Sequence, residues 1–187
     1  MNERVPPSRA RFPPFAVTVD VAALTLVDAK LHILLIRRAR APYSDRWALP
    51  GGFKQPDETL EAAAARELAE ETHAMPESGL VQFHAYGDPG RDPRTNVVTV
   101  AFVALLRDLA SIRAGDDAKD AALHPVADVV SGRLPMAFDH RRIVTDAVAF
   151  LRRDVATSDR LPPRVSSPFT RTELLAAFAS LDRELGT

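Results

Sequence analysis

The sequence predicts a protein of the α/β class, and three observations support that class. Apolar stretches of strand length occur at residues 17–27, 31–39, 80–86 and 96–106. Two segments place apolar residues at helical spacing, at residues 59–72 and 139–153. Strands and helices are mixed along the chain, as expected where helices pack on a sheet.

The first half of the chain is predicted to begin with a β-hairpin. Its two strands, residues 17–27 and 31–39, are separated by an Asp-Ala-Lys turn at residues 28–30. After a loop, residues 47–52 read Trp-Ala-Leu-Pro-Gly-Gly, which predicts a short strand ended by proline and glycine. We assign Trp47 to the core.

The second half is predicted to contain two further strands and two helices. The strand at residues 96–106 is apolar almost throughout, which is typical of a central position in a sheet. Residues 110–119 are polar and are predicted to be a loop, whereas residues 121–129 are ambiguous. Asp139 is expected to cap the helix that follows.

A last helix is predicted at residues 170–185. Thr170 is its expected cap, and Glu173 stands three residues later, which is the spacing of a capping box. Because the helix follows a proline-containing break, it is expected to be an element appended to the main domain.

Composition and charge exclude several kinds of site, and charge alone is not expected to attract some classes of partner. The 187 residues carry a formal net charge of −1, so no overall field would draw the chain to nucleic acid or to an anionic membrane. There is no cysteine, which excludes disulfides, thiolate metal sites and cysteine nucleophiles. Residues 1–14 lack the apolar run of a signal peptide or a membrane span, and we expect a cytoplasmic protein.

The predicted helix at residues 59–72 carries three acidic residues, Glu67, Glu70 and Glu71. At about 100° per residue these carboxylates fall within an arc of roughly 100° on one face of the helix. They repel one another unless a cation neutralises them, and such hard oxygen ligands suit Mg²⁺ or Mn²⁺. We therefore predict a divalent-metal site on this face. The opposite, packed face is expected to consist of Ala65, Leu68, Ala69 and Thr72.

The spacing around this helix resembles the Nudix box, G-x₅-E-x₇-R-E-U-x-E-E-x-G-U, in which U is a bulky apolar residue. Gly52, Glu58 and the Arg-Glu-Leu-Ala-Glu-Glu run at residues 66–71 have the same separations. Two positions depart from the pattern, because His73 stands in place of a glycine and Ala74 in place of a large apolar residue. A helix exit favours a left-handed residue, which histidine adopts only at a modest cost.

The resemblance to the Nudix family covers about residues 17–153. It implies an α/β/α sandwich with a mixed β-sheet, to which the C-terminal helix is added. Residues 1–14 are expected to be a flexible N-terminal segment, and residues 15–155 a Nudix domain. Residues 156–187 are expected to be a linker and a C-terminal helix, which is a candidate winged-helix remnant.

The resemblance also implies hydrolysis of a nucleoside diphosphate derivative. Family members use the glutamates that match Glu67, Glu70 and Glu71 as metal ligands and sometimes as the base, and we favour Glu67 or Glu70 as the base without ranking them. The backbone carbonyl of Gly51 or Gly52 is a further candidate ligand.

Two other box residues have expected supporting roles. Arg66 lies four residues before Glu70 and can pair with it, which would hold a carboxylate in position for catalysis. Glu58 precedes the helix, where it would support the metal site, steady the loop or contact the substrate.

Substrate preference is expected to depend on residues outside the box. Four segments, taken in order, resemble the ADP-ribose pyrophosphatase branch and related regulators of NAD metabolism; they are residues 47–53, 90–94, 115–118 and 137–140. By that resemblance, Arg91 and Arg94 are candidates to bind the phosphate or terminal ribose of a nucleotide substrate. Asp116 or Asp117 is a candidate loop carboxylate near the metal, and His140 is a candidate anion contact.

Two classes of function follow, and we favour the enzyme, since all metal carboxylates are present. It would cleave ADP-ribose to AMP and ribose 5-phosphate, or would be a nucleoside triphosphate diphosphatase. The alternative is an ADP-ribose-sensing transcription regulator, because residues 169–175 resemble the start of a winged-helix region. The segment up to Thr187 is expected to be too short for a recognition helix, so a nucleic-acid partner is not expected. Relatives commonly form dimers, which makes a homodimer possible.

Overall fold

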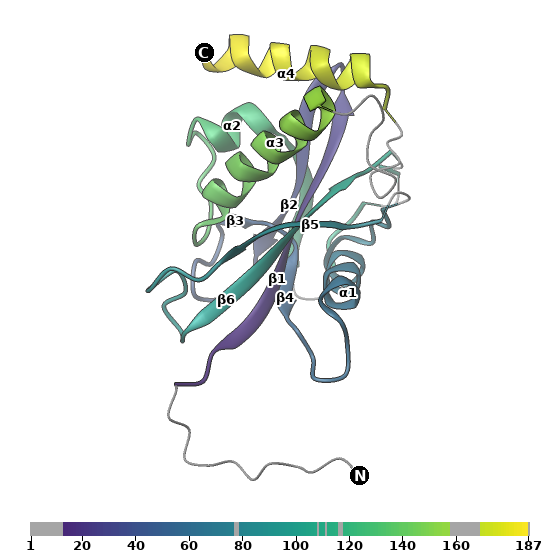
Figure 1. Ribbon diagram of the computed structural model, residues 1–187. Coiled ribbons are helices and arrows are strands. Elements are labelled where there is room, and N and C mark those ends of the chain that lie inside the picture. Colours follow the sequence, from purple (N-terminus) through teal and green to yellow (C-terminus); the bar gives the residue numbers. More distant parts are fainter. Residues whose placement is uncertain are drawn as a thin grey trace, which may run out of the picture.

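The computed structural model describes residues 13–76, 79–107, 109–110, 112–115, 118–157 and 169–186. Within these ranges the strands form one mixed sheet with the order β3-β2-β1-β6-β5, while β4 pairs with β1 and β7 pairs with β2. Helices cover both faces of this sheet (Figure 1). The predicted α/β/α sandwich with a mixed sheet is therefore confirmed.

The predicted hairpin is formed by β1 (Ala16–Val27) and β2 (Lys30–Arg38), which pair in antiparallel fashion. Asp28 and Ala29 form the two-residue turn with φ values of 49° and 60°. Positive φ at both central residues matches the right-handed twist of the flanking strands. β2 also pairs with the short strand β3 (Trp47–Ala48).

The sheet is mixed because β6 (Val97–Leu105) runs parallel to β1, whereas β5 (Val81–Tyr86) runs antiparallel to β6. β6 lies between these two strands and is almost entirely buried, which confirms its predicted central position. Residues 121–129, which were ambiguous in the sequence, belong to a strand and a helix. The strand β7 (Ala118–Pro125) is followed directly by the short helix α2 (Val126–Val130).

Alternation along β1 divides the core between the two faces of the sheet. Val19 and Val21 face the helix α1 (Leu60–Thr72), whereas Ala22 and Leu24 face the helix α3 (His140–Thr157). Successive side chains of a strand point to opposite faces, so one strand contributes to both layers. In Figure 1, α1 lies on one side of the sheet and α2 and α3 lie on the other. Trp47 packs against the core on the α3 side and is partly buried, as its assignment to the core requires.

Both ends of α1 are capped. The hydroxyl of Thr59 accepts a hydrogen bond from the backbone N–H of Ala62, which caps the first turn. His73 adopts the left-handed conformation with φ 57°, and its backbone N–H donates to the carbonyl of Ala69. Histidine therefore provides the helix exit that glycine provides in the family pattern.

The last helix, α4 (Arg171–Leu185), begins with the predicted capping box of Thr170 and Glu173. It buries four apolar residues, Leu174, Ala177, Phe178 and Leu181, of which all except Ala177 belong to the core cluster on the α3 side. The predicted linker and N-terminal segment fall largely on residues 158–168 and 1–12, which are outside the described ranges. Among the described helices, none has both the length and the apolar run that crossing a bilayer requires.

Candidate active site

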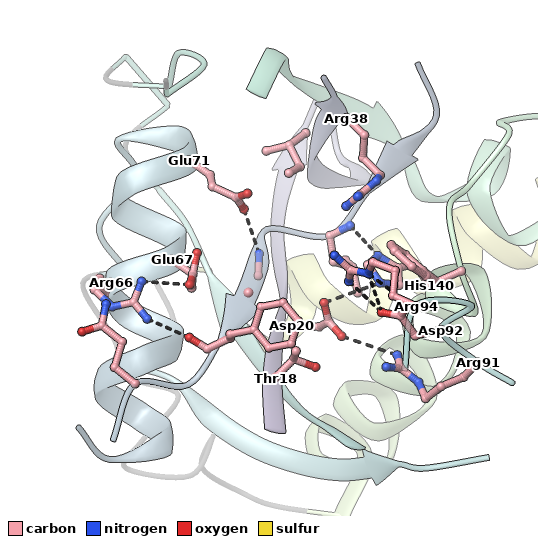
Figure 2. Close-up of a pocket in the computed structure, with 17 residues that line it drawn as sticks. Thr18, Asp20, Arg38, Arg66, Glu67, Glu71, Arg91, Asp92, Arg94 and His140 are labelled. Carbon is pink, nitrogen blue, oxygen red and sulfur yellow. Dashed lines mark hydrogen bonds and ion pairs between the residues drawn. The ribbon is translucent and has the colours of Figure 1, made fainter. Parts of the chain in front are cut away.

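A pocket of about 440 Å³ lies beside α1 and is built by residues from both halves of the chain (Figure 2). Box residues form one wall, and residues of the 91–94 loop and of the start of α3 form another. β1 and β2 contribute the remaining surface. The lining residues are Thr18, Asp20, Ile36, Arg38, Leu49, Gly51, Gly52, Phe53, Gln55, Arg66, Glu67, Glu71, Arg91, Asp92, Arg94, Phe138 and His140.

The orientation of α1 differs from the prediction in one respect. Leu68 and Thr72 are buried as expected, but Ala65 is exposed, so its placement on the packed face was wrong. Glu71 follows Ala64 by seven residues and therefore shares its face of the helix, which is the buried one. The acidic and apolar faces are thus adjacent, and two of the three carboxylates point into the protein.

Glu71 is the more deeply placed of these two carboxylates. Its Oε2 atom accepts a hydrogen bond of 2.8 Å from the backbone N–H of Gly51. Burial raises the pKa of Glu71 to about 8, and the charges of Glu67 and Asp20 act in the same direction. The folded protein therefore holds Glu71 in a position where its negative charge is poorly stabilised by the protein alone.

Glu67 lies against the backbone of the Gly51–Phe53 strand, β4. A Cβ atom at Gly52 would lie too close to Oε1 of Glu67, so any other residue there would force the carboxylate to move away from this position. Burial raises the pKa of Glu67, although Arg66 opposes that effect. Glycine at position 52 therefore lets the carboxylate of Glu67 approach the backbone of β4.

Arg66 donates hydrogen bonds to three carboxylates. It donates to Glu58 at 2.7 and 3.0 Å and to Glu67 at 2.8 Å, and its 3.1 Å pair with Glu70 confirms the predicted contact. The hydrogen bond with Glu58 raises the pKa of Arg66 and lowers that of Glu58 to about 2. Glu58 also accepts a hydrogen bond from the backbone N–H of Gln55, so it contacts the loop before α1.

Glu70 is placed differently from its two neighbours. Its side chain is 60% exposed, contacts Arg66, and is absent from the pocket lining. In the described part of the chain, no three acidic, histidine or cysteine side chains are grouped as a complete metal site. The structure therefore brings Glu67 and Glu71 into the pocket and leaves Glu70 beside it.

The donors in the pocket fit a divalent cation. Glu67 and Glu71 are hard oxygen ligands on one side of the pocket. Burial raises the pKa of both, and repulsion by the charge of Glu67 raises that of Glu71 further. A cation between them would relieve that repulsion. Because Gly51 pairs with Asp20 across β4 and β1, its backbone also lies at this end of the pocket.

On the other side of the pocket, Arg91 lies in a buried network of charges. It donates two hydrogen bonds to Asp139, of 2.7 and 3.0 Å, and its Nη2 atom is 3.7 Å from Asp20. Asp20 also accepts a hydrogen bond from Thr99. Asp139, predicted as a helix cap, thus binds the guanidinium of Arg91 through both carboxylate oxygens.

His140 connects this network to the box loop. Its Nδ1 atom accepts a hydrogen bond of 2.9 Å from the backbone N–H of Leu49, which places the ring proton on Nε2, 3.5 Å from Asp20. Burial lowers the pKa of His140, so the ring is neutral. Through this bond, α3 holds the start of the Leu-Pro-Gly-Gly segment in position.

We therefore expect His140→Phe to destabilise the fold. Phenylalanine is similar in size but cannot accept a hydrogen bond, so the buried N–H of Leu49 would lose its partner, at a cost of about 1–3 kcal/mol. Urea unfolding at pH 7 would measure this loss. His140→Gln, whose amide oxygen can accept, should lose less. Equal stability of the wild-type protein and His140→Phe would contradict the role of this hydrogen bond.

Arg94 lines the pocket, and its guanidinium lies near two aromatic rings. It donates to Asp92 at 2.6 and 3.0 Å, and its guanidinium carbon is 5.4 Å from the ring centre of Phe53 and 5.6 Å from that of Phe138. Arg91 and Arg94, predicted as equivalent substrate contacts, therefore differ: Arg91 is buried in ion pairs, whereas Arg94 is 41% exposed.

The pocket also contains residues that the sequence analysis did not select, chiefly Asp20, Arg38 and Phe138. A single acidic residue within an otherwise apolar strand was a detectable signal for Asp20, since a buried charge needs a partner. No comparable local signal distinguishes Arg38 from the other arginines. The predicted loop carboxylates Asp116 and Asp117 lie outside the described residues.

Comparison with known proteins agrees with this geometry. A family model described as the NUDIX domain matches residues 17–147. The ADP-ribose pyrophosphatase of Methanocaldococcus jannaschii is 36% identical over 131 residues, which cover 70% of this chain and 72% of that protein. The ADPR responsive transcriptional repressor NtrR of Acinetobacter baylyi is 34% identical over 172 residues, which cover 89% of this chain and 66% of the repressor.

A solved structure shows the same fold with a ligand. The NUDIX domain of NrtR from Shewanella oneidensis, in complex with ADP-ribose, matches with a TM-score of 0.71 and 33% identity, over 81% of this chain and 99% of that chain. The family model spans more than half of the sequence, and the pyrophosphatase is similar across most of its length. The protein therefore belongs to the Nudix family, as the box predicted.

Proposed function

We propose that the protein hydrolyses the diphosphate linkage of ADP-ribose and releases AMP and ribose 5-phosphate. The observation that carries this proposal is the pair of partly buried carboxylates, Glu67 and Glu71, facing a pocket whose other side contains arginines. The choice of ADP-ribose is supported by the pyrophosphatase relative and by the ADP-ribose-bound Nudix neighbour.

In this reaction the oxygen of water forms a bond to one phosphorus, and the bond from that phosphorus to the bridging oxygen breaks. Glu67 and Glu71 would hold Mg²⁺ or Mn²⁺, with the backbone of Gly51 as a further candidate ligand. Such a cation neutralises phosphate oxygens and lowers the pKa of water. The base that accepts the proton of water would be Glu67 or Glu70.

The remaining polar residues would position these groups. Arg66 fixes the orientation of Glu67 through a 2.8 Å hydrogen bond and is itself anchored by Glu58. Arg94 is exposed at the pocket and would contact the substrate, whereas Arg91 would act by fixing Asp139 and Asp20. The aromatic rings of Phe53 and Phe138 provide an apolar surface beside Arg94.

A second candidate function is ligand-controlled transcription. The repressor relative matches 89% of this chain, although this chain spans only 66% of the repressor's length. In that function ADP-ribose would bind in the same pocket without being cleaved. DNA binding, which the net charge does not favour, would then be expected.

One set of assays separates these functions. The purified chain would be incubated with Mg²⁺ and ADP-ribose, NADH, diadenosine polyphosphates or nucleoside triphosphates, and the products would be separated by chromatography. We expect AMP from ADP-ribose. Binding of ADP-ribose without cleavage, together with retention of promoter DNA at low salt, would instead support the regulator. Cleavage of nucleoside triphosphates alone would support the diphosphatase alternative.

A further inference from the structure

Arg38 is the last residue of β2, and its side chain lines the pocket. Its Nε atom donates a hydrogen bond of 2.8 Å to the carbonyl of Pro42, and its guanidinium carbon is 4.9 Å from the ring centre of Phe138. Figure 2 shows the side chain directed from the strand into the pocket. The backbone carbonyl and the aromatic ring thus fix the plane of the guanidinium.

The terminal nitrogens of Arg38 differ from those of the other pocket arginines. Arg66, Arg91 and Arg94 each donate to at least one carboxylate. For Arg38, the described residues provide only the carbonyl of Pro42 as a hydrogen-bond acceptor, and that acceptor is used by Nε. Two donor groups of a planar guanidinium are therefore available to a ligand on the pocket side.

The electrostatic environment of Arg38 also favours an added anion. Burial lowers the pKa of Arg38, and the charge of Arg94 lowers it further. Glu71 lies in the same pocket and acts in the opposite direction, but among the described ion pairs none joins Glu71 to Arg38. The pocket thus keeps a carboxylate and a guanidinium apart, each in an environment that disfavours its charge.

We propose that Arg38 binds a non-bridging phosphate oxygen of the diphosphate substrate, from the side of the pocket opposite the carboxylates of α1. The proposal rests on the proposed diphosphatase function and adds a substrate-binding residue to it. A diphosphate fits this arrangement because a cation at Glu67 and Glu71 would bind some of its oxygens and leave others for a guanidinium. Phosphate accepts two parallel hydrogen bonds from the planar fork of arginine, which lysine cannot reproduce.

Binding of inorganic diphosphate in the presence of EDTA tests this role without requiring catalysis. Isothermal titration calorimetry would compare the wild-type protein, Arg38→Met and Arg38→Lys. We expect Arg38→Met to raise the dissociation constant about tenfold to a hundredfold, which is the effect of losing a hydrogen bond to a charged group. Arg38→Lys should fall between these two proteins, because it keeps the charge but loses the fork.

Arg37→Met is the matched control. Arg37 is the preceding residue of the same strand, is 45% exposed, and pairs with Asp45 outside the pocket. Its replacement should change the dissociation constant less than twofold. Circular dichroism and thermal unfolding would verify that each variant is folded, and Arg38→Lys provides the comparison if Arg38→Met does not fold.

Two results would overturn the proposal: a wild-type protein that fails to bind diphosphate in EDTA, or Arg38 variants that bind it as tightly as Arg37→Met does. Cleavage of ADP-ribose by the wild-type protein with Mg²⁺ is measured separately. If cleavage occurs but diphosphate binding is independent of Arg38, only this proposal fails. If binding depends on Arg38 but ADP-ribose is not cleaved, only the proposed function fails.

Discussion

Replacing Glu71 with glutamine is expected to lower kcat/KM for ADP-ribose hydrolysis by about a thousandfold, a loss of about 4 kcal/mol of transition-state stabilisation. Glu71 is one of the two carboxylates that the fold directs into the pocket, and glutamine offers a neutral amide oxygen in place of an anionic ligand. The hydrogen bond from Gly51 can persist, since the amide oxygen of glutamine also accepts. The loss should therefore arise from charge, not from a disrupted loop.

Initial rates of AMP release at saturating Mg²⁺ would measure this effect. Glu61→Gln is the matched control, because Glu61 is an exposed acidic residue in the first turn of the same helix. Its rate should stay within a factor of two of the wild-type rate. Glu70→Gln, measured in parallel, tests the exposed carboxylate that is a candidate base. A Glu71→Gln protein with wild-type kcat/KM would refute the assignment of the metal site to this pocket.

Local signals were sufficient to predict much of the fold. The start of α4 depends on the predicted capping box, in which Thr170 and Glu173 are three positions apart in the sequence. The hairpin depends on a two-residue turn between strands that pair with each other. Such contacts span few residues, so the sequence around them contains the information that determines them.

The orientation of α1 could not be predicted from the same kind of information. Helical spacing gives the angles between Glu67, Glu70 and Glu71, but it does not determine which of them faces the sheet. That choice depends on contacts such as the hydrogen bond from Gly51 to Glu71, which joins residues 20 positions apart. A cluster of like charges on a helix therefore predicts a site more reliably than it predicts which members enter the pocket.

The arginines illustrate the same limit. Arg91 and Arg94 lie in one short segment and looked equivalent, yet Arg91 meets Asp139, 48 positions away, whereas Arg94 meets Asp92, two positions away. Arg38 lines the pocket because it lies at the end of β2 and because Pro42 and Phe138 orient its side chain. Partners brought together by the sheet and α3 decide which guanidinium is available to a ligand, and these partners are far apart in the sequence.

The contribution of Glu71 to the stability of the metal-free protein should fall as the pH rises from about 4.5 to about 8. Burial raises the pKa of Glu71 from 4.5 to about 8 in the folded state, so across this window the folded protein retains a proton that the unfolded chain has lost. Stability falls with rising pH wherever the native state binds more protons than the unfolded state. We expect Glu71 to account for a loss on the order of 2–4 kcal/mol.

Glu71→Gln isolates this contribution, because Glu67 and other groups titrate in both proteins. Urea unfolding in EDTA should show a smaller decrease in stability for the variant, which would therefore be more stable than the wild-type protein at pH 8. Adding Mn²⁺ at that pH should stabilise the wild-type protein and have much less effect on the variant, since a ligand stabilises only the state that binds it. Parallel pH profiles for the two proteins would show that the folded protein itself stabilises the negative charge of Glu71. In that case the carboxylate would need no cation, and this argument for a metal in the pocket would fail.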